Sequence, residues 1–299
     1  MTTPSSPTRR HCLGAAGAAL ASVWLPAARV QAAAPAQPLP RLVTVGGGIT
    51  EVVYALQAQD QLVGTDTTSL YPEAAQLTPK VGYLRQLSAE GLLALRPQAV
   101  IAPSDAGPPV VLDQLRSAGV QLELVPSTHD WTEVQRKVAA VGRASHRAGA
   151  ALALQARLDQ DWAETQNRVR RHSTAAPRAL FVMAHSGSAT VSGQQTAAHA
   201  MLTLAGARNA LTSFNGYRPM TAEAMAAAAP DVIVTTRQSL DATGGEAAFW
   251  QRPELALTPA WRRRSEANTL VVLDALELLG FGPRLPQVVW HLHQQLVRT

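Results

Sequence analysis

The sequence predicts an α/β protein of two lobes, each with a mostly parallel central sheet flanked by helices, joined by a long backbone helix. Three observations support this fold class. Short β-type runs alternate with helical stretches up to about residue 129 and again after Pro177, which is typical of parallel α/β units. Between these two regions, residues 131–172 show no strand signal. Finally, two segments resemble each other at a constant offset of 133 residues.

The alternating pattern of the first region gives its elements in order. They are a strand at 42–45, a helix at 49–58, a strand at 62–64, a helix at 88–95, a strand at 99–101, a helix at 110–118 and a strand at 122–125. The middle region holds two helices, at 131–144 and 148–171, and the second would be roughly 35 Å long. A helix of that length can run across two lobes.

The last region repeats the α/β pattern. It contains strands at 179–183, 232–234 and 270–273 and helices at 196–205 and 286–297. We therefore expect five parts along the chain, with the helical spine between the two lobes. They are a signal peptide at 1–32, a flexible leader at 33–40, an N-terminal α/β lobe at 41–129, a helical spine at 130–173 and a C-terminal α/β lobe at 174–299.

The two matching segments share a helix-capping hydroxyl, a first-turn carboxylate, an apolar helix, a proline and a β-type run. The first copy contains Ser88, Glu90, Pro97 and 99–101, and the second contains Thr221, Glu223, Pro230 and 232–234. The hydroxyl satisfies free N–H groups of the helix, and the carboxylate suits the positive end of its dipole. At the same offset Arg85 corresponds to Arg218. We therefore expect two related lobes whose arginines approach an inter-lobe cleft from opposite sides.

The N-terminus has the pattern of an export signal. Arg9 and Arg10 precede an apolar, alanine-rich run, no acidic residue occurs before Glu51, and residues 30–32 offer small side chains for cleavage. The paired arginines fit either an ordinary signal or a twin-arginine signal, so both export routes stay open. A membrane anchor is the alternative, but the apolar run is short and interrupted by Pro26.

Composition excludes several classes of function. The one cysteine, Cys12, lies in the predicted signal, so the mature chain would have no disulfide, cysteine-ligated metal or cysteine nucleophile. Removal of residues 1–32 takes the formal net charge from +5 to +2, and no basic stripe with interleaved aromatics is present. The sequence therefore predicts no nucleic-acid partner.

No catalytic or nucleotide motif is complete. Gly46, Gly47 and Gly48 follow a strand as in a dinucleotide site, but Glu51 stands where a third glycine is wanted. The sequence has no phosphate loop and no HExxH motif, and Ser186 does not lie in a nucleophile elbow. We therefore expect a binding protein rather than an enzyme.

Five short segments together carry a resemblance to a known family. They are VGGGITE at 45–51, VGYLR at 81–85, MAH at 183–185, YRP at 217–219 and LGFG at 279–282. With these segments, the chain resembles from about residue 41 onward the periplasmic hemin-binding proteins of bacterial ABC importers. This family belongs to the helical-backbone substrate-binding class, which also includes cobalamin and siderophore receptors.

The resemblance implies haem as the transported ligand, one or two per protein, bound between the lobes. It assigns Tyr83 as the axial ligand of ferric iron, Arg218 as a cation near that oxygen, and His185 as an additional ligand in members that hold two haems. Phenolate is a known axial ligand of haem iron, and a nearby arginine favours the anion. Arg85 and Arg218 would also pair with the haem propionates.

The chemistry of the side chains gives further candidates for the ligand site. Tyr217 would line the cleft with Met183, and Tyr71, Met220 and Phe281 are additional wall candidates; each of these is also an ordinary packing residue. The resemblance implies that Glu90 and Glu223, one per lobe, dock on basic residues of a permease dimer in the inner membrane. The protein would act in the periplasm as a monomer.

Two other functions stay open at the sequence level. A receptor of the same class for cobalamin or a ferric siderophore would not need Tyr83 as a ligand. A periplasmic α/β enzyme, such as a metal-dependent hydrolase, is less favoured because the sequence has no clustered ligand motif.

Overall fold

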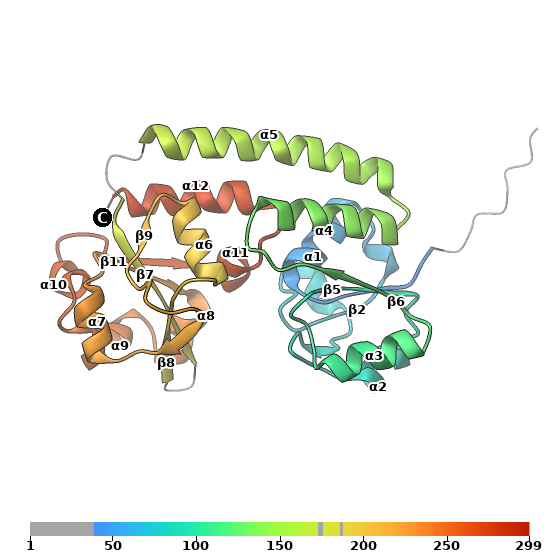
Figure 1. Cartoon of the computed structure of the whole chain (residues 1–299), viewed down its shortest axis with the longest axis horizontal. Coiled ribbons are helices and arrows are strands. Elements are labelled where there is room, and N and C mark those ends of the chain that lie inside the picture. The colour runs from blue at the N-terminus through green and yellow to red at the C-terminus, as the bar shows by residue number, and fades with distance from the viewer. Residues whose placement is uncertain (1–38, 173–175, 186–187, 299) are drawn as a thin grey trace, which may run out of the picture. The chain divides into compact units, whose positions relative to one another are not determined.

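A computed structural model describes residues 39–172, 176–185 and 188–298, except for the side chains of His185 and Ser188. The predicted signal peptide, and all of the predicted leader but its last two residues, lie outside the described residues. The fold predicted from the sequence is confirmed: two α/β lobes are connected through a long helix (Figure 1).

The N-terminal lobe is built on a four-stranded parallel sheet. Its strand order is β2 (Leu62–Thr65), β1 (Leu42–Thr44), β5 (Ala99–Pro103) and β6 (Gln121–Val125). Helices α1 (Gly47–Ala55) and α4 (Trp131–Ala144) cover one face, and α2 (Ala89–Ala94) and α3 (Pro109–Ser117) cover the other (Figure 1). Successive strand residues point to opposite faces, so Val100 joins the core under α2 and α3 while Ile101 joins the core under α1 and α4.

A short hairpin stands apart from this sheet. Strand β3 (Gly82–Tyr83) pairs antiparallel with β4 (Gln86–Leu87), and Tyr83 is opposite Gln86. The sequence predicts a loop here, because strands of two residues are too short to show an alternating pattern. Gly82 has φ +100°, a conformation that favours glycine, and this opens the hairpin.

The C-terminal lobe is built on a mixed sheet. Its order is β10 (Tyr217–Pro219), β8 (Ser188–Ser192), β7 (Arg178–His185), β11 (Val232–Thr236) and β12 (Leu270–Leu273), and β9 (Arg208–Asn209) also pairs with β7. Strands β7, β9, β11 and β12 are parallel, whereas β8 and β10 run antiparallel to their neighbours. The sequence pattern misses β8, β9 and β10. Serine, threonine, arginine and proline obscure the alternation in β8 and β10, and β9 has only two residues.

Helices cover both faces of this second sheet. One face packs against α6 (Ala197–Leu204), α11 (Ala275–Leu279) and α12 (Leu285–Leu296), and the other against α7 (Ala222–Ala228), α9 (Glu246–Trp250) and α10 (Pro259–Arg263). The further helices are α8 (Arg237–Thr243) and the 3-10 turns η1 (Gln59–Gln61), η2 (Glu73–Leu77) and η3 (Pro253–Leu255).

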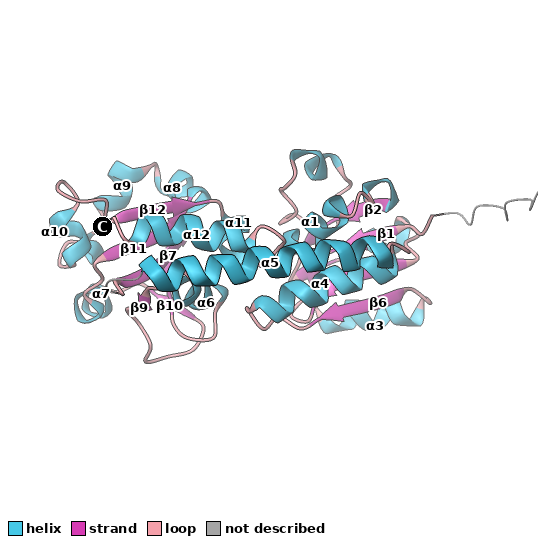
Figure 2. Cartoon of the chain, turned by 90° about the horizontal axis from the view of Figure 1, so that it is seen from above, coloured by secondary structure: helices cyan, strands magenta, loops and turns pink. Residues whose placement is uncertain are grey.

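Helix α5 (Ala148–His172) has 25 residues and is roughly 37 Å long. It lies on α4 along its first part and on α12 along its last part (Figure 2). Its side chain Leu158 belongs to the core of the N-terminal lobe, and Trp162, one turn later, belongs to that of the C-terminal lobe. The rings of Trp162 and Trp131 stack at 5.1 Å. The helix therefore contributes to both cores, as its predicted length suggested.

The lobes also meet directly at the start of α1. A Cβ atom at Gly48 would lie 2.2 Å from the carbonyl oxygen of Gly280, so glycine permits this close approach. Glu51 is 6% exposed and forms two hydrogen bonds with Arg284, at 2.9 and 2.8 Å. Nearby, Lys137 donates from Nζ to the Gly280 oxygen at 2.8 Å. The glycine run and Glu51 thus serve contact between the lobes.

Candidate functional site

Loops that follow parallel strands gather at one edge of the N-terminal sheet. Carboxyl ends of parallel strands meet at the same edge, where α/β proteins commonly bind ligands. Residues 66–72 follow β2, residues 104–108 follow β5 and residues 126–130 follow β6. The Tyr83 hairpin joins this edge through hydrogen bonds from the Thr67 amide to the Gly82 oxygen and from the Gly107 amide to the Leu84 oxygen, both 2.9 Å.

Tyr83 and Arg85 are in direct contact on this hairpin. Arg85 donates from Nη1 to the Tyr83 hydroxyl oxygen at 2.8 Å and from Nη2 to Asp105 Oδ2 at 2.5 Å. Tyr83 is 40% exposed, so the residue is open to solvent while its hydroxyl oxygen is held by a cation. The residue pair that the sequence singled out is therefore an organised polar group.

Electrostatics stabilise the charged forms of this group. Partial burial opposes the charge on Arg85, but Tyr83 and Asp105 outweigh it and raise the pKa of the guanidinium. Partial burial also acts to raise the pKa of Asp105, but the hydrogen bond from Ser127 and the charge of Arg85 bring it below its ordinary value. Both shifts favour a charged guanidinium on Arg85 and a charged carboxylate on Asp105.

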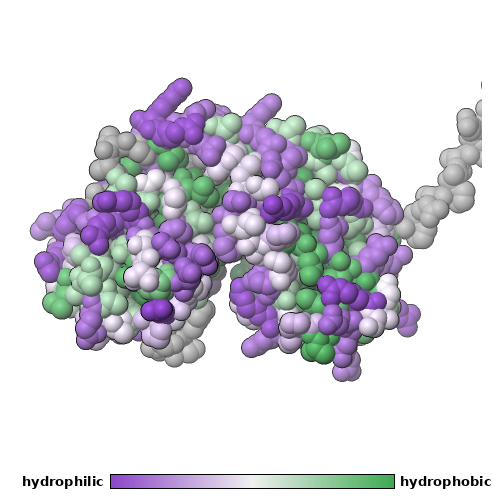
Figure 3. All heavy atoms as spheres, in the orientation of Figure 1, coloured by the Kyte–Doolittle hydropathy of each residue, from purple (hydrophilic) through white to green (hydrophobic). Residues whose placement is uncertain are grey.

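Tyr217 of the C-terminal lobe lies near enough to Arg85 for the charge of Arg85 to act on its phenol. Burial raises the pKa of the Tyr217 phenol, while hydrogen bonds with Thr196 and Ala198 and the positive charge of Arg85 act to lower it. Because Arg85 lies in the other lobe, the two sides face each other across the gap between the lobes. Figure 3 shows that the surface is hollowed between the lobes on the face in view.

Register in the C-terminal sheet places Tyr217 and Met183 together. Tyr217 is opposite Ser192 and Pro219 is opposite Thr190, which in turn is opposite Met183. Tyr217, Pro219 and Met183 therefore share one face of the sheet. The Tyr217 ring meets Phe181, from the same face of β7, edge-on at 6.5 Å.

Arg218 lies on the opposite face of the sheet from Tyr217. Its guanidinium is exposed and lies over the Phe214 ring, 4.5 Å from the centroid. The donor to the Tyr83 oxygen is thus Arg85, two residues away in the same hairpin, and the described contacts of Arg218 are within its own lobe.

His185 is the last residue of β7 and pairs with Ser188 of β8 through the backbone. Its side chain lies outside the described residues. The strand nevertheless places position 185 at the carboxyl end of β7, on the same edge of the sheet as the carboxyl ends of β11 and β12.

The three additional wall candidates, Tyr71, Met220 and Phe281, have other surroundings. Met220 and Phe281 are 7% and 1% exposed and belong to the two cores of the C-terminal lobe, so the expectation that they line a ligand surface is wrong. Tyr71 is 47% exposed, and the Arg284 guanidinium lies 3.8 Å from its ring centroid. Tyr71 therefore covers the ion pair between the lobes.

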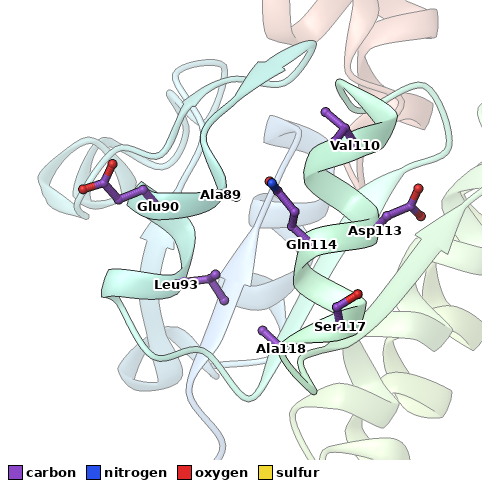
Figure 4. Close-up of a pocket in the computed structure, with 8 residues that line it drawn as sticks. All are labelled: Ala89, Glu90, Leu93, Val110, Asp113, Gln114, Ser117 and Ala118. Carbon is purple, nitrogen blue, oxygen red and sulfur yellow. The ribbon is translucent and has the colours of Figure 1, made fainter.

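Glu90 and Glu223 occupy equivalent positions in the two lobes. Each is exposed in the first turn of its helix, after a cap in which Ser88 accepts from the Gly91 amide at 3.3 Å and Thr221 accepts from the Ala224 amide at 3.2 Å. The capped helices predicted from the repeat are confirmed. Glu90 also borders a groove between α2 and α3, and its carboxylate points away from that groove (Figure 4).

The described part of the chain contains no group of three or more histidine, cysteine, aspartate or glutamate side chains placed to hold a metal ion. Within the same part, no helix is long and apolar enough to cross a membrane. The sequence interpretation missed Asp105 and Ser127, which complete the polar group around Arg85. The available signal was their position, because they come shortly after the predicted strands at 99–101 and 122–125.

Comparison with solved structures gives extensive matches. The periplasmic heme-binding protein BhuT, solved in complex with two hemes, is 45% identical with a TM-score of 0.81, over 86% of this chain and 97% of that one. The periplasmic heme-binding protein RhuT from Roseiflexus sp. RS-1, in apo form, is 34% identical with a TM-score of 0.80, over the same shares. These matches confirm the resemblance predicted from the sequence.

Curated relatives are more distant. An uncharacterized ABC transporter substrate-binding lipoprotein of Bacillus subtilis, YvrC, is 27% identical over 66% of this chain, and the chain spans 63% of that relative. A vitamin B12-binding protein of Yersinia pestis is 25% identical over 87% of this chain and 92% of that protein. Residues 42–265 match the family model described as periplasmic binding protein. The chain belongs to the periplasmic binding protein family, whose members bind ligands rather than catalyse reactions.

Proposed function

We propose that this protein captures haem between its two lobes in the periplasm and delivers it to an ABC permease, without covalent chemistry. The proposal is supported by the likeness to two haem-binding proteins at 45% and 34% identity. The single structural observation that carries it is the 2.8 Å hydrogen bond from Arg85 to the Tyr83 hydroxyl oxygen. This contact leaves an accessible phenol oxygen beside a fixed cation.

Such a phenol suits ferric haem. Ferric iron favours a hard anionic oxygen, and phenolate is one of its axial ligands in proteins. In our proposal the iron takes the place of the Tyr83 proton, and Arg85 stabilises the charge that stays on the oxygen. Tyr217 and Met183 would contact the porphyrin from the other lobe, since they share one face of the sheet.

The acidic edge of haem requires cations. We propose that Arg218 pairs with a propionate, because its guanidinium is exposed and is held over Phe214 by a contact that leaves its N–H groups available. Arg85 is the second cation near the site, although two of its N–H groups already point to Tyr83 and Asp105.

The number of haems depends on position 185. BhuT was solved with two hemes. We propose that His185, at the carboxyl end of β7, ligates the iron of a second haem stacked on the first. One haem would be bound through Tyr83 if His185 takes no part.

Delivery requires a docking surface. We propose that Glu90 and Glu223 form ion pairs with basic residues of a permease dimer in the inner membrane, one glutamate per subunit. Their equivalent, exposed positions in the two lobes match the two-fold symmetry of such a dimer. The binding protein itself would be a monomer with lobes at 41–129 and 174–299, a spine at 130–173, and export through a signal at 1–32 followed by a flexible leader at 33–40.

Titration of the mature protein with ferric haem, followed by absorption spectroscopy, tests this function. We expect a saturable change with a phenolate-to-iron band, and loss of that band in Tyr83→Ala. Tyr54→Phe is the matched control, because Tyr54 lies on α1 and has no role in the proposed site. No saturable change with the unmodified protein would refute haem as the ligand.

Cobalamin is the second candidate, favoured by the 25% identity to a vitamin B12-binding protein over 269 residues. A parallel titration with cobalamin and with a ferric siderophore distinguishes the ligands. Saturable cobalamin binding that is unaffected by Tyr83→Ala, with no haem binding, would support this candidate instead.

A further inference from the structure

Asp105 accepts one hydrogen bond from the Arg85 guanidinium, which lies beside Tyr83, and another from Ser127. Its Oδ2 accepts from Arg85 Nη2 at 2.5 Å, and its Oδ1 accepts from the Ser127 hydroxyl at 2.7 Å. Ser127 is itself fixed, because its amide donates to the Ser104 hydroxyl at 3.1 Å. A continuous chain of hydrogen bonds thus runs from Ser127 through Asp105 and Arg85 to the Tyr83 oxygen.

The backbone sets the two ends of this chain at fixed positions. The Gly107 amide donates to the Leu84 oxygen, and the Leu87 amide donates to the Gly107 oxygen, both at 2.9 Å, so the hairpin is tied to the segment that carries Asp105. The Ser104 amide donates to the Val125 oxygen at 2.8 Å, which ties that segment to the end of β6. The carboxylate therefore faces Arg85 on a framework that does not depend on the ion pair.

An arginine without such support would not point reliably at one oxygen. Its side chain has many rotamers, and ordering it costs entropy. The Arg85 side chain is 56% exposed, so packing alone does not hold it. The contrast within the same lobe is Asp113, a 71% exposed carboxylate whose partner in the described part of the chain is Arg116, three residues along α3.

We infer that Asp105, braced by Ser127, is a positioning residue that fixes the Arg85 guanidinium so that Nη1 faces the Tyr83 oxygen. This inference rests on the proposed function, because it assigns Asp105 a role in how Tyr83 receives the iron of haem. The inference also gives the two arginines of the site different roles. Asp105 holds Arg85 against the Tyr83 oxygen, so Arg218 is the arginine that we expect to pair with a ligand carboxylate.

Two substitutions separate the support from the charge. Asp105→Ala removes the acceptor for Arg85. Asp105→Asn keeps an acceptor for Arg85. The new amide nitrogen can donate to the Ser127 hydroxyl oxygen, so the amide oxygen still faces Arg85. Asp113→Ala is the matched control, an exposed carboxylate of the same lobe paired with an arginine.

The first measurement uses ligand-free protein and does not depend on the ligand. In crystal structures of the variants, we expect Arg85 to leave the Tyr83 oxygen in Asp105→Ala and to keep its place in Asp105→Asn and Asp113→Ala. An Arg85 that still donates to Tyr83 in Asp105→Ala would overturn the inference. This result stands whether or not haem proves to be the ligand.

The second measurement is a double-mutant cycle on haem affinity. We expect Asp105→Ala to weaken binding roughly tenfold, the scale of one charge-assisted hydrogen bond, and to shift the phenolate-to-iron band, with Asp105→Asn close to the unmodified protein. In an Arg85→Ala background, Asp105→Ala should have no additional effect. A full additional effect in that background would mean that Asp105 does not act through Arg85.

Discussion

Arg284 of the C-terminal lobe forms two hydrogen bonds with Glu51 of the N-terminal lobe, although the two residues are 233 positions apart in sequence. Glu277 adds a second carboxylate to Arg284 at 3.0 Å, and the ring of Tyr71 lies over the same guanidinium. This ion pair connects the helix that opens the first lobe to the helix that closes the second. Its removal therefore measures how much contact between the lobes contributes to the stability of the protein.

Arg284→Ala should destabilise the protein by roughly 3 kcal/mol, because it leaves the Glu51 carboxylate buried without its main partner. Burial already raises the pKa of Glu51 above its ordinary value despite Arg284. When folding raises the pKa of a carboxyl group, the folded protein loses stability as the pH rises through that pKa. Removal of Arg284 raises the pKa of Glu51 further, because Arg284 acts to lower it. The difference between variant and unmodified protein should therefore grow as the pH rises above about 4, the ordinary pKa of a glutamate.

Urea unfolding at several pH values measures this difference. Arg116→Ala is the control, since Arg116 forms an exposed pair whose loss should change little. A difference that shrinks as the pH rises would contradict the assignment to Glu51.

Gly48→Ala should destabilise the contact between the lobes by roughly 1–3 kcal/mol or more, because the new Cβ would lie 2.2 Å from the Gly280 oxygen. Gly149→Ala is the matched control on α5, where a Cβ meets nothing within 4 Å. It should stabilise by roughly 0.5–1 kcal/mol, the usual preference of a helix for alanine. Denaturant midpoints measure both, and equal effects of the two substitutions would contradict the close approach.

Tyr217→Phe should leave the phenolate-to-iron band intact, whereas Tyr83→Phe should remove it. Burial raises the pKa of Tyr217 above its ordinary value, so this phenol stays protonated at neutral pH. Absorption spectra of the haem-loaded variants at neutral pH check the prediction. Loss of the band in Tyr217→Phe alone would move the iron ligand to the other lobe.

His185→Ala should reduce the haem stoichiometry from two to one if His185 holds a second haem. Tyr83 lies in the other lobe, so its own haem should bind as before. Titration end points at known protein concentration give the stoichiometry. An unchanged ratio would remove His185 from the ligand set, and His199→Ala, a histidine on α6, serves as the control.

Glu90→Arg combined with Glu223→Arg should abolish haem uptake in a reconstituted importer and leave haem binding unchanged. Charge reversal replaces attraction to basic permease residues by repulsion, while both positions are exposed and outside the haem site. Each reversal also costs roughly 0.3–1 kcal/mol at a helix N-terminus, which a thermal melt would report. Glu164→Arg on α5 is the control, and uptake that survives the double reversal would exclude these two residues as the docking pair.

The sequence by itself determined the elements whose signal is local. The alternation of apolar runs predicted the parallel strands other than β9, and the cap, carboxylate and proline pattern predicted α2 and α7. The unbroken helical spacing of 148–171 predicted α5 within one residue of its observed end. These patterns depend on neighbours no more than about four positions away, so they can be recognised without the fold.

Only the tertiary structure decided which distant residues meet. It placed Asp105 and Ser127 beside Arg85, paired Glu51 with Arg284, and buried Phe281. None of these contacts produces a periodic pattern in the sequence, because each one joins residues from separate elements. The sequence singled out Tyr83 through its resemblance to a family, and the fold shows its surroundings: a hairpin at the edge of a parallel sheet, where Arg85 donates to the phenol oxygen.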